Sequence, residues 1–309
     1  MRYGCEPCSL AKEHPIERKL SDKLKKIGKR LLGDGNSSFI GKWPPGDREL
    51  YYEQFETQVV NERRFYNVGA GVNFRHPAWQ NVGLPSEAYG SEHVDMVWDL
   101  QECTPMPVDV DTAQIMYSRY TLEHVTDVAV QNFLNESYRV LRKGGVLRVI
   151  VPDIEVYYAA YEAREPELFQ KPKRDTKTYP NKKFKENPNT ASFEQRFLWT
   201  FASSTSTIHQ MDVPHRIDDE ELRKVLAELP LQEALDYCTA RASIEFQRKF
   251  PQFHTNWFSD EKLARMMQAA GFTKPYRSSV GASKSPVLWD LRLFDGRRPE
   301  IGLFMEAIK

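Results

Sequence analysis

The sequence predicts an α/β fold built on a parallel, doubly wound sheet. Between residues 63 and 153, short apolar runs alternate with polar segments that have helical spacing. The run 146–151 is apolar almost throughout, as expected for a strand that is covered on both faces. Strands that alternate with helices form parallel sheets, because each connecting helix returns the chain to the same edge of the sheet.

Four shorter strands are expected before this one, and another closes the chain. The expected ranges are 65–68, 80–84, 93–100, 113–117 and 301–308. A helix over 127–141 carries an apolar stripe and is expected to stop at Lys143-Gly144-Gly145, because cations suit the last turn and glycine the position beyond it. A second amphipathic helix spans 259–270, with Ser259 as its N-cap.

The chain divides into an N-terminal helical extension, residues 1–60, and a main domain, residues 61–309. Within the extension, 14–32 predicts a basic amphipathic helix. Such a helix either contacts an acidic surface or membrane headgroups, or packs on the main domain with its lysines in solvent. Packing is favoured, because its apolar residues are numerous enough to dock a helix.

A mostly helical and more polar insertion is expected over residues 154–250, where it could form a lid on the main domain. Its segment 171–190 is rich in lysine and arginine and is interrupted by prolines, which predicts a loop. The loop is either a clamp for a substrate or a plain surface loop. A clamp of this composition favours an anionic or sugar-rich acceptor.

Composition excludes several functional classes. The 309 residues contain 43 basic and 43 acidic side chains, so no net field attracts nucleic acid or an anionic membrane. No transmembrane run and no signal peptide are expected, which favours a cytoplasmic protein. Cys5 and Cys8 form a C-x-x-C pair, but His14 would supply only a third ligand. Reduced thiols are therefore expected, and no metal site.

A glycine turn follows the first expected strand at Gly69-Ala70-Gly71. Glycine adopts positive φ and lets the backbone approach a ligand closely. A helix that starts after this turn would direct its N–H groups at an anionic group of the ligand. The third glycine of the dinucleotide fingerprint is missing, which argues against NAD.

Two further stretches stand at the same expected edge of the sheet. Asp99 ends a strand and could accept hydrogen bonds from an adenine amino group or ribose hydroxyls, or could instead cap the turn that follows. The loop 118–124 follows the fourth strand and contains Glu123 and His124. His124 is a candidate general base, and the alternative is that both side chains cap and pack the loop.

Together these stretches resemble the class I S-adenosylmethionine-dependent methyltransferases of the small-molecule type. The motifs that carry the resemblance are Asn67–Gly71, Val97–Leu100, Leu122–His124, Glu136–Asp153, Ala269–Phe272 and Leu303–Lys309. The resemblance covers about 63–153 and 254–309, and the run from Glu136 is the most specific. It implies a Rossmann-like, mostly parallel seven-stranded sheet, with the helical insertion placed before the last strands.

The resemblance also implies S-adenosylmethionine as cofactor and assigns residues to it. Gly69, Gly71 and their neighbours Asn67 and Ala70 would lie beneath its methionine part, and Ser118 and Arg119 would line the same side. Asp99 and Leu100 would flank the adenine. The family usually has a ribose-binding acid where this chain has Gly83, and Glu87 could reach back to replace it.

The activity implied is in-line methyl transfer to a small-molecule or saccharide acceptor, with His124 as the first candidate base and His254 as the second. The main alternative is a non-catalytic binding or scaffold protein, which Gly83 favours. Nucleic-acid modification is disfavoured, because no Asn/Asp-Pro-Pro-aromatic motif follows the fourth strand. Aminopropyl transfer stays open, although no acidic polyamine pocket is evident.

Overall fold

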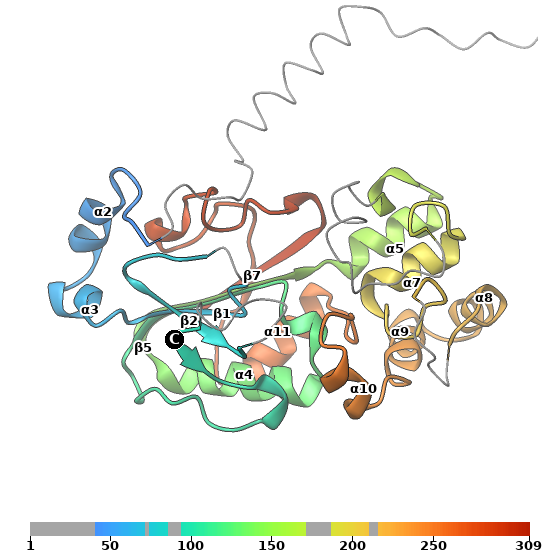
Figure 1. Ribbon diagram of the computed structural model, residues 1–309, viewed down its shortest axis with the longest axis horizontal. Coiled ribbons are helices and arrows are strands. Elements are labelled where there is room, and N and C mark those ends of the chain that lie inside the picture. Colours follow the sequence, from blue (N-terminus) through green and yellow to red (C-terminus); the bar gives the residue numbers. More distant parts are fainter. Residues whose placement is uncertain (1–40, 72–73, 86–93, 171–186, 210–215) are drawn as a thin grey trace, which may run out of the picture.

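The computed structural model describes residues 41–71, 74–85, 94–170, 187–209 and 216–309. Its centre is a seven-stranded sheet with the order β3-β2-β1-β4-β5-β7-β6 (Figure 1). The first five strands are parallel, and β7 runs antiparallel to both of its neighbours. The predicted α/β, mostly parallel sheet is confirmed.

The strands lie close to the predicted ranges. They are β1 (Phe65–Val68), β2 (Trp79–Gly83), β3 (Met96–Val97), β4 (Ala113–Arg119), β5 (Leu141–Pro152), β6 (Tyr276–Arg277) and β7 (Gly302–Ile308). Two predictions were wrong in detail. β3 is much shorter than 93–100, because the chain turns into a 3-10 helix at Leu100. Lys143–Gly145 does not form a separate stop, because Gly144 and Gly145 hydrogen-bond to the backbone of Lys309 and extend β5 backward.

Nine α-helices are present in the described ranges. They are α2 (Asp47–Gln54), α3 (Thr57–Asn61), α4 (Asp127–Val140), α5 (Ile154–Glu162), α7 (Phe193–Phe201), α8 (Asp219–Glu228), α9 (Leu231–Thr239), α10 (Ile244–Lys249) and α11 (Asp260–Ala269). Side chains cap several of these helices by accepting a hydrogen bond from a backbone amide of the first turn. Thr126 caps α4, Asp153 caps α5 and Ser259 caps α11. The predicted N-cap at Ser259 is thus confirmed. None of these helices has the length and hydropathy needed to cross a bilayer, and the cytoplasmic location stays a prediction.

Two helices cover one face of the sheet. α4 and α11 lie side by side there, as Figure 1 shows. Their buried side chains, including Phe133, Leu134, Leu263 and Met267, pack against the apolar residues that β1, β4, β5 and β7 direct to this face. Burial of such large side chains is the main stabilising contribution to this layer.

The opposite face is covered by α2, α3 and the irregular segment 278–301. Tyr51 of α2 and Val60 of α3 are buried in the same cluster as Phe294, so residues 47–61 belong to the packed core. The division at residue 60 stays a prediction, and the predicted helix 14–32 lies outside the described residues. The described residues between the glycine turn and β2 contain no helix: residues 74–76 have no regular structure and 77–78 form a turn. The side-chain amide of Asn81 donates a hydrogen bond to the carbonyl of Phe74.

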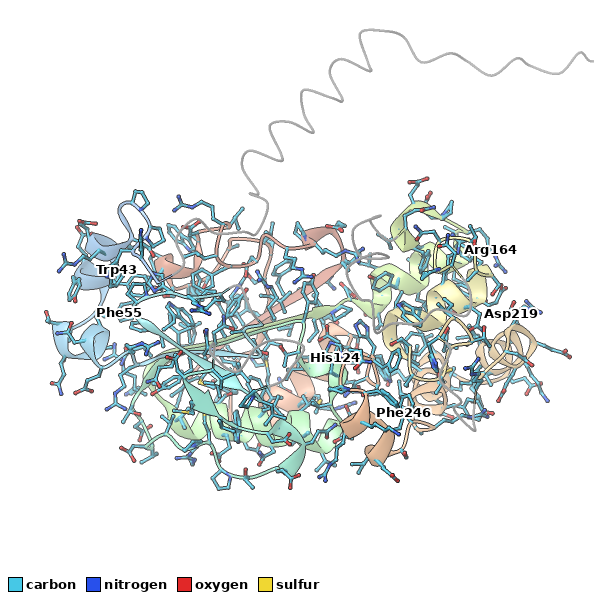
Figure 2. The ribbon with its side chains drawn as sticks, in the orientation of Figure 1. Trp43, Phe55, His124, Arg164, Asp219 and Phe246 are labelled. Atoms are coloured by element: carbon cyan, nitrogen blue, oxygen red, sulfur yellow. The ribbon has the colours of Figure 1, made fainter. Side chains whose placement is uncertain are left out.

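The predicted helical insertion contains α5, α7, α8, α9 and α10 and lies beyond the carboxyl end of β5 (Figure 1). It has an aromatic core of its own, in which the rings of Tyr161 and Phe197 stack at 4.6 Å. Figure 2 shows His124 between this insertion, which carries Arg164 and Asp219, and the sheet. The insertion therefore covers the edge at which parallel sheets bind ligands. Most of the basic loop 171–190 lies outside the described residues.

Candidate functional site

A cavity of about 880 Å³ lies at the carboxyl edge of the sheet, against the helical insertion. Strand ends, the loop after β4 and residues of the insertion all contribute to its lining. The lining residues include, from the strand ends, Gly69, Gly83 and Asp99. The loop after β4 contributes His124, the insertion Thr200, and the segment before α11 His254. The volume is ample for a nucleoside-sized ligand together with a second small molecule.

The glycine turn forms one wall of the cavity. Gly69 has a φ of 75° and Gly71 a φ of 63°. A Cβ atom at Gly69 would lie 2.0 Å from the hydroxyl oxygen of Thr121, so no other residue fits there. Asn67 and Ala70 also line the cavity. The structure thus brings together the four residues of this stretch that were predicted to bind the cofactor.

The end of β2 leaves space where a ribose-binding acid was expected. A Cβ atom at Gly83 would meet only the amide nitrogen of Gly69, at 4.0 Å. A larger side chain would therefore have space and would start close to the glycine turn, although the φ of 158° at Gly83 means that a substitution there also strains the backbone. Glu87, the predicted substitute for the missing acid, lies outside the described residues.

Asp99 caps a turn and also lines the cavity. Its Oδ1 accepts a hydrogen bond from the amide of Gln101 at 2.9 Å and so begins the 3-10 helix η2 (Leu100–Glu102). The predicted capping role is confirmed, and it leaves Oδ2 available to a ligand, since one carboxylate has several acceptor positions. Leu100 is buried beside it and lines the same cavity.

The structure brings Arg119 to the cavity but does not bring Ser118 there. Ser118 is fully buried, and its hydroxyl has no hydrogen-bond partner among the described residues. Tyr117 and Arg119 line the cavity on either side of it. Side chains alternate along a strand, so Ser118 of β4 faces the layer of α4 instead. The family resemblance had placed both residues on the methionine side.

Glu123 is a cavity residue that sequence analysis treated only as a partner of His124. It belongs to the 3-10 helix η3 (Leu122–His124) and is 2% exposed. Its Oε2 has no hydrogen-bond partner among the described residues. Burial raises the pKa of the carboxyl to about 8, and a hydrogen bond with its own backbone amide only partly opposes this. An acid next to a histidine at the end of β4 was the signal in the sequence.

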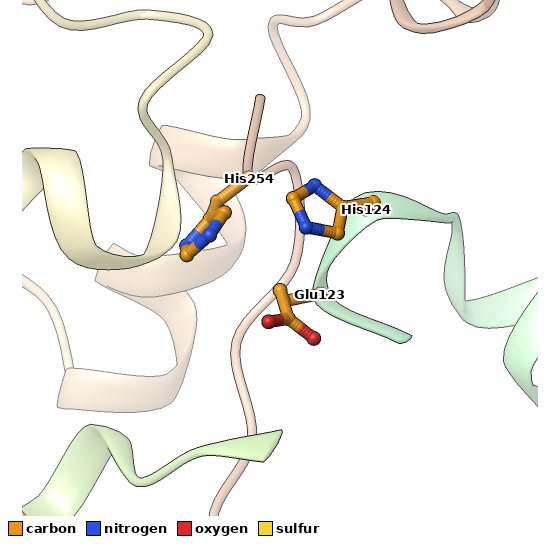
Figure 3. A group of neighbouring side chains, drawn as sticks. All are labelled: Glu123, His124 and His254. Atoms are coloured by element: carbon orange, nitrogen blue, oxygen red, sulfur yellow. The ribbon is translucent and has the colours of Figure 1, made fainter. Parts of the chain in front are cut away.

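The two predicted catalytic histidines meet at Glu123. His124 and His254 are far apart in the chain, yet their ring centroids are 4.8 Å apart. The candidate ligand atoms of all three side chains lie within 4.8 Å of one another, and Figure 3 shows the carboxylate below the two rings. We refer to these three residues as the Glu–His–His group. Both histidines line the cavity.

Backbone carbonyls fix the orientation of both rings. Nδ1 of His124 lies 3.0 Å from the carbonyl oxygen of Phe253, and Nδ1 of His254 lies 2.6 Å from that of Thr200. A carbonyl can only accept, so each Nδ1 carries the hydrogen. In a neutral imidazole the lone pair then resides on Nε2, which is the atom that can accept a proton or bind a metal ion.

Two tyrosines add hydroxyl groups to the lining. Burial raises the pKa of Tyr157 to about 12, and it also raises the pKa of Tyr120 well above its ordinary value. Both hydroxyls are therefore protonated near neutral pH and can donate hydrogen bonds. The hydroxyl of Tyr120 donates to the carbonyl of Arg298. Neither residue was given a role from the sequence, because nothing in a lone tyrosine marks it as a cavity residue.

Residues 69–149 match the family model described as a methyltransferase domain. The matched segment runs from the glycine turn through most of β5, and the sheet around it is the mostly parallel, seven-stranded one that the resemblance implied. The match covers about a quarter of the chain, and within these residues the chain is similar to a methyltransferase domain. No curated protein matches the sequence.

The chain is also similar, at low identity, to solved structures of methyltransferases. A methyltransferase from Thermotoga maritima, described as a possible histamine N-methyltransferase, is 14% identical and has a TM-score of 0.38, with 95% of this chain and 98% of that chain covered. One from Mesorhizobium loti is 13% identical, with a TM-score of 0.37 and coverage of 80% and 90%. Phosphoethanolamine N-methyltransferase 2 from Haemonchus contortus is 11% identical, with a TM-score of 0.35; 93% of this chain covers 57% of that longer protein.

Proposed function

We propose that this protein is an S-adenosylmethionine-dependent methyltransferase that acts on a small-molecule or saccharide acceptor. One observation supports this most strongly. A single cavity, within a methyltransferase domain, has the glycine turn and Asp99 on its sheet side and the Glu–His–His group near the insertion. One side suits a nucleoside-type cofactor, and the other suits an acceptor that must lose a proton.

The cofactor side is assigned to residues that end the strands. The backbone at Gly69-Ala70-Gly71 would lie along the methionine part, which only glycine geometry allows at Gly69. The guanidinium of Arg119 lines this wall and can pair with the carboxylate of the methionine part. Oδ2 of Asp99 would accept hydrogen bonds from the ribose or the adenine, and Leu100 would pack against the base.

The reaction requires alignment and exclusion of water more than it requires covalent chemistry from the protein. S-adenosylmethionine supplies an activated methyl group on a sulfonium. Residues of the helical insertion, such as Tyr157 and Thr200, line the cavity and would shield a bound acceptor from water.

The cationic lining supports an acceptor that carries a negative charge or many hydroxyl groups. Arg119, Arg297 and Arg298 all line the cavity. Only Arg298 among them has an ion pair within the described residues, at 3.3 Å from Glu300. Guanidinium groups bind carboxylates and phosphates in a bidentate manner. The protonated hydroxyl of Tyr157 could serve a sugar hydroxyl instead.

A non-catalytic binding or scaffold protein is the second candidate function. The observation that favours it is the open space at Gly83, where the family usually has an acid that grips the ribose. Such a protein would retain the cavity but bind the cofactor weakly or not at all. The two candidates therefore differ in cofactor binding, which can be measured without knowledge of the acceptor.

Calorimetric titration of the full chain with S-adenosylmethionine and S-adenosylhomocysteine tests the proposal, with NADH as the unrelated nucleotide. We expect micromolar binding of both cofactor forms and none of NADH. A binder at a hundredfold excess over its dissociation constant should also gain about 2.7 kcal/mol in stability. Absence of both heat and thermal stabilisation at millimolar ligand would reject the enzyme and favour the scaffold.

A further inference from the structure

We propose that Glu123, His124 and His254 bind a divalent first-row transition-metal ion, which holds the acceptor hydroxyl in the cavity. Binding of the ion stands on the geometry of the three side chains alone. Its role in methyl transfer rests on the function proposed above. Among the described residues, this is the group of acidic, histidine and cysteine side chains placed to bind a metal ion.

The donor set is one that catalytic metal sites use. Two imidazoles and one carboxylate hold zinc in hydrolytic sites and iron in oxygenase sites, with positions left open for a substrate or water. In a tetrahedral site with bonds of about 2.0–2.1 Å, neighbouring ligand atoms are about 3.4 Å apart. One possible ligand atom of each side chain lies within 4.8 Å of the other two, so rotation of the side chains toward one another would complete the site.

The surroundings of the ligands are already arranged for metal binding. The Nδ1–H groups of His124 and His254 both donate to backbone carbonyls, an arrangement that orients metal-binding imidazoles and leaves Nε2 as the ligand atom. The backbone carbonyl of Glu123 accepts from the amide of Thr255 at 2.8 Å, and the amide of His254 donates to the hydroxyl of Ser203 at 2.8 Å. The segment that carries His254 is thus fastened to the loop that carries Glu123.

The buried carboxyl of Glu123 also has no compensating cation among the described residues. Glu123 is 2% exposed, one of its oxygens lacks a hydrogen-bond partner, and no lysine or arginine in the described ranges forms an ion pair with it. The other fully buried acids, Asp153, Asp295 and Glu306, each pair with an arginine. An isolated buried carboxylate is costly, and a bound divalent ion would compensate it.

The ion would act on the acceptor. A hydroxyl bound to a divalent metal ion loses its proton much more readily than a free one. With the ion bound, the three side chains are its ligands and do not accept the proton, which leaves to water instead. The acceptor oxygen forms a bond to the methyl carbon. The bond from that carbon to sulfur breaks, and its electron pair stays on sulfur. The products are a methyl ether and uncharged S-adenosylhomocysteine.

Metal titration of the full chain tests the site directly. The background protein carries Cys5→Ser and Cys8→Ser, which removes a separate C-x-x-C pair that could bind metal. After dialysis against chelator, Co²⁺ is followed by its visible absorption and Zn²⁺ by calorimetry. We expect one ion per chain, with no sulfur-to-cobalt charge-transfer band.

The variants Glu123→Gln and His254→Gln should each weaken metal affinity by more than about tenfold, the lower limit of the loss when a group that only orients a ligand is removed. His76→Gln is the matched control, because His76 is a buried histidine that pairs with Asp47, away from the cavity. Its affinity should be unchanged. Circular dichroism and thermal melting of every variant confirm that each one is folded.

Two outcomes would overturn the metal site: no binding of Co²⁺ or Zn²⁺ by the folded background protein, or binding that the Glu123 and His254 variants leave unchanged. Binding of S-adenosylhomocysteine is measured in the same samples without metal. If it binds while the metals do not, the methyltransferase function stands and the metal site falls. If the metals bind while S-adenosylhomocysteine does not, the metal site stands and the methyltransferase function falls.

Discussion

Two buried acidic centres in this protein are built in opposite ways. Around Arg148 of β5, Asp295 and Glu306 accept hydrogen bonds from one guanidinium, and all three side chains are fully buried. Arg148 and Glu306 stand opposite each other in the antiparallel pair of β5 and β7, and the hydroxyl of Tyr117 contacts Asp295. Every charge in this centre has a partner supplied by the chain.

The second centre is Glu123 in the cavity, where the chain supplies no cation in the described ranges. Asp99, at the other side of the same cavity, has a backbone amide as its partner and no ion pair. Buried charges that serve stability are paired, because an unpaired one costs more than it contributes. The difference indicates that the acids of the cavity are kept for ligands, whereas those around Arg148 hold the sheet together.

The largest expected effect is the loss of the paired centre. Arg148→Met keeps the volume of the side chain but leaves two buried carboxylates without a cation. We expect it to lower the free energy of unfolding by roughly 3–5 kcal/mol, as measured by urea denaturation. Arg64→Met is the control: Arg64 forms an ion pair with Glu62 near the surface, and its loss should cost less than about 1 kcal/mol. Equal losses in the free energy of unfolding of the two variants would contradict the conclusion that the buried centre around Arg148 stabilises the fold more than a surface ion pair does.

The unpaired centre should respond to metal instead. In the background without Cys5 and Cys8, Zn²⁺ at a hundred times its dissociation constant should stabilise the protein by about 2.7 kcal/mol. Glu123→Gln should lose at least about half of this gain at the same Zn²⁺ concentration, because a tenfold weaker site would keep only about 1.4 kcal/mol. In chelator at neutral pH, Glu123→Gln should unfold at a higher denaturant concentration than the background protein, because glutamine keeps the shape of the side chain and removes a carboxyl whose ionised form burial disfavours. Equal stabilisation of both proteins by Zn²⁺ would remove Glu123 from the site.

Asp99 extends the comparison to the cofactor side. Asp99→Ala should weaken binding of S-adenosylhomocysteine by at least tenfold, since a hydrogen bond to a charged group contributes about 1.5–3 kcal/mol. Calorimetry measures the change. Asp99→Asn separates the two roles of this residue, because asparagine can still cap the amide of Gln101 but carries no charge. If Asp99→Ala binds as tightly as wild type, Asp99 serves only the turn.

Local patterns were enough to predict the strands, the cap and the glycine turn on the sheet side of the cavity. β1 and β7 were read from short apolar runs, and they lie within one residue of the expected bounds. The cap at Ser259 and the glycine turn at 69–71 depend on neighbours a few residues away, which a sequence displays directly. The family match over 69–149 covers this same part of the chain.

The acceptor side depends on contacts that no local pattern contains. His124 and His254 meet only because the loop after β4 and the segment before α11 pack together through the amide of Thr255. Each histidine was chosen separately from the sequence. The role of Glu123 could be proposed only once its burial was known. Ser118 was expected to line the cavity. β4 continues to Arg119, two residues beyond its predicted end, and the alternation of side chains along it turns Ser118 away from the cavity.

Gly83→Asp carries the smallest expected effect and the sharpest test of how the cavity uses acids. The position has room for a side chain, since the nearest atom to an added Cβ is the amide nitrogen of Gly69 at 4.0 Å. A carboxylate there would start beside the turn assigned to the cofactor and could accept from the ribose. A new hydrogen bond of about 0.5–1.5 kcal/mol would tighten binding of S-adenosylhomocysteine several-fold.

Gly83→Asn is the matched control for this variant, because it has the same size without the charge. Tighter binding by the aspartate alone would mean that the ribose lacks an acidic partner in the natural protein, and that the cavity tolerates a third unpaired carboxylate. Weaker binding in both variants would mean that the ribose already occupies the space at Gly83 and is held from elsewhere. In that case the chain has moved its acid rather than lost it, and Glu87 is the first residue to substitute.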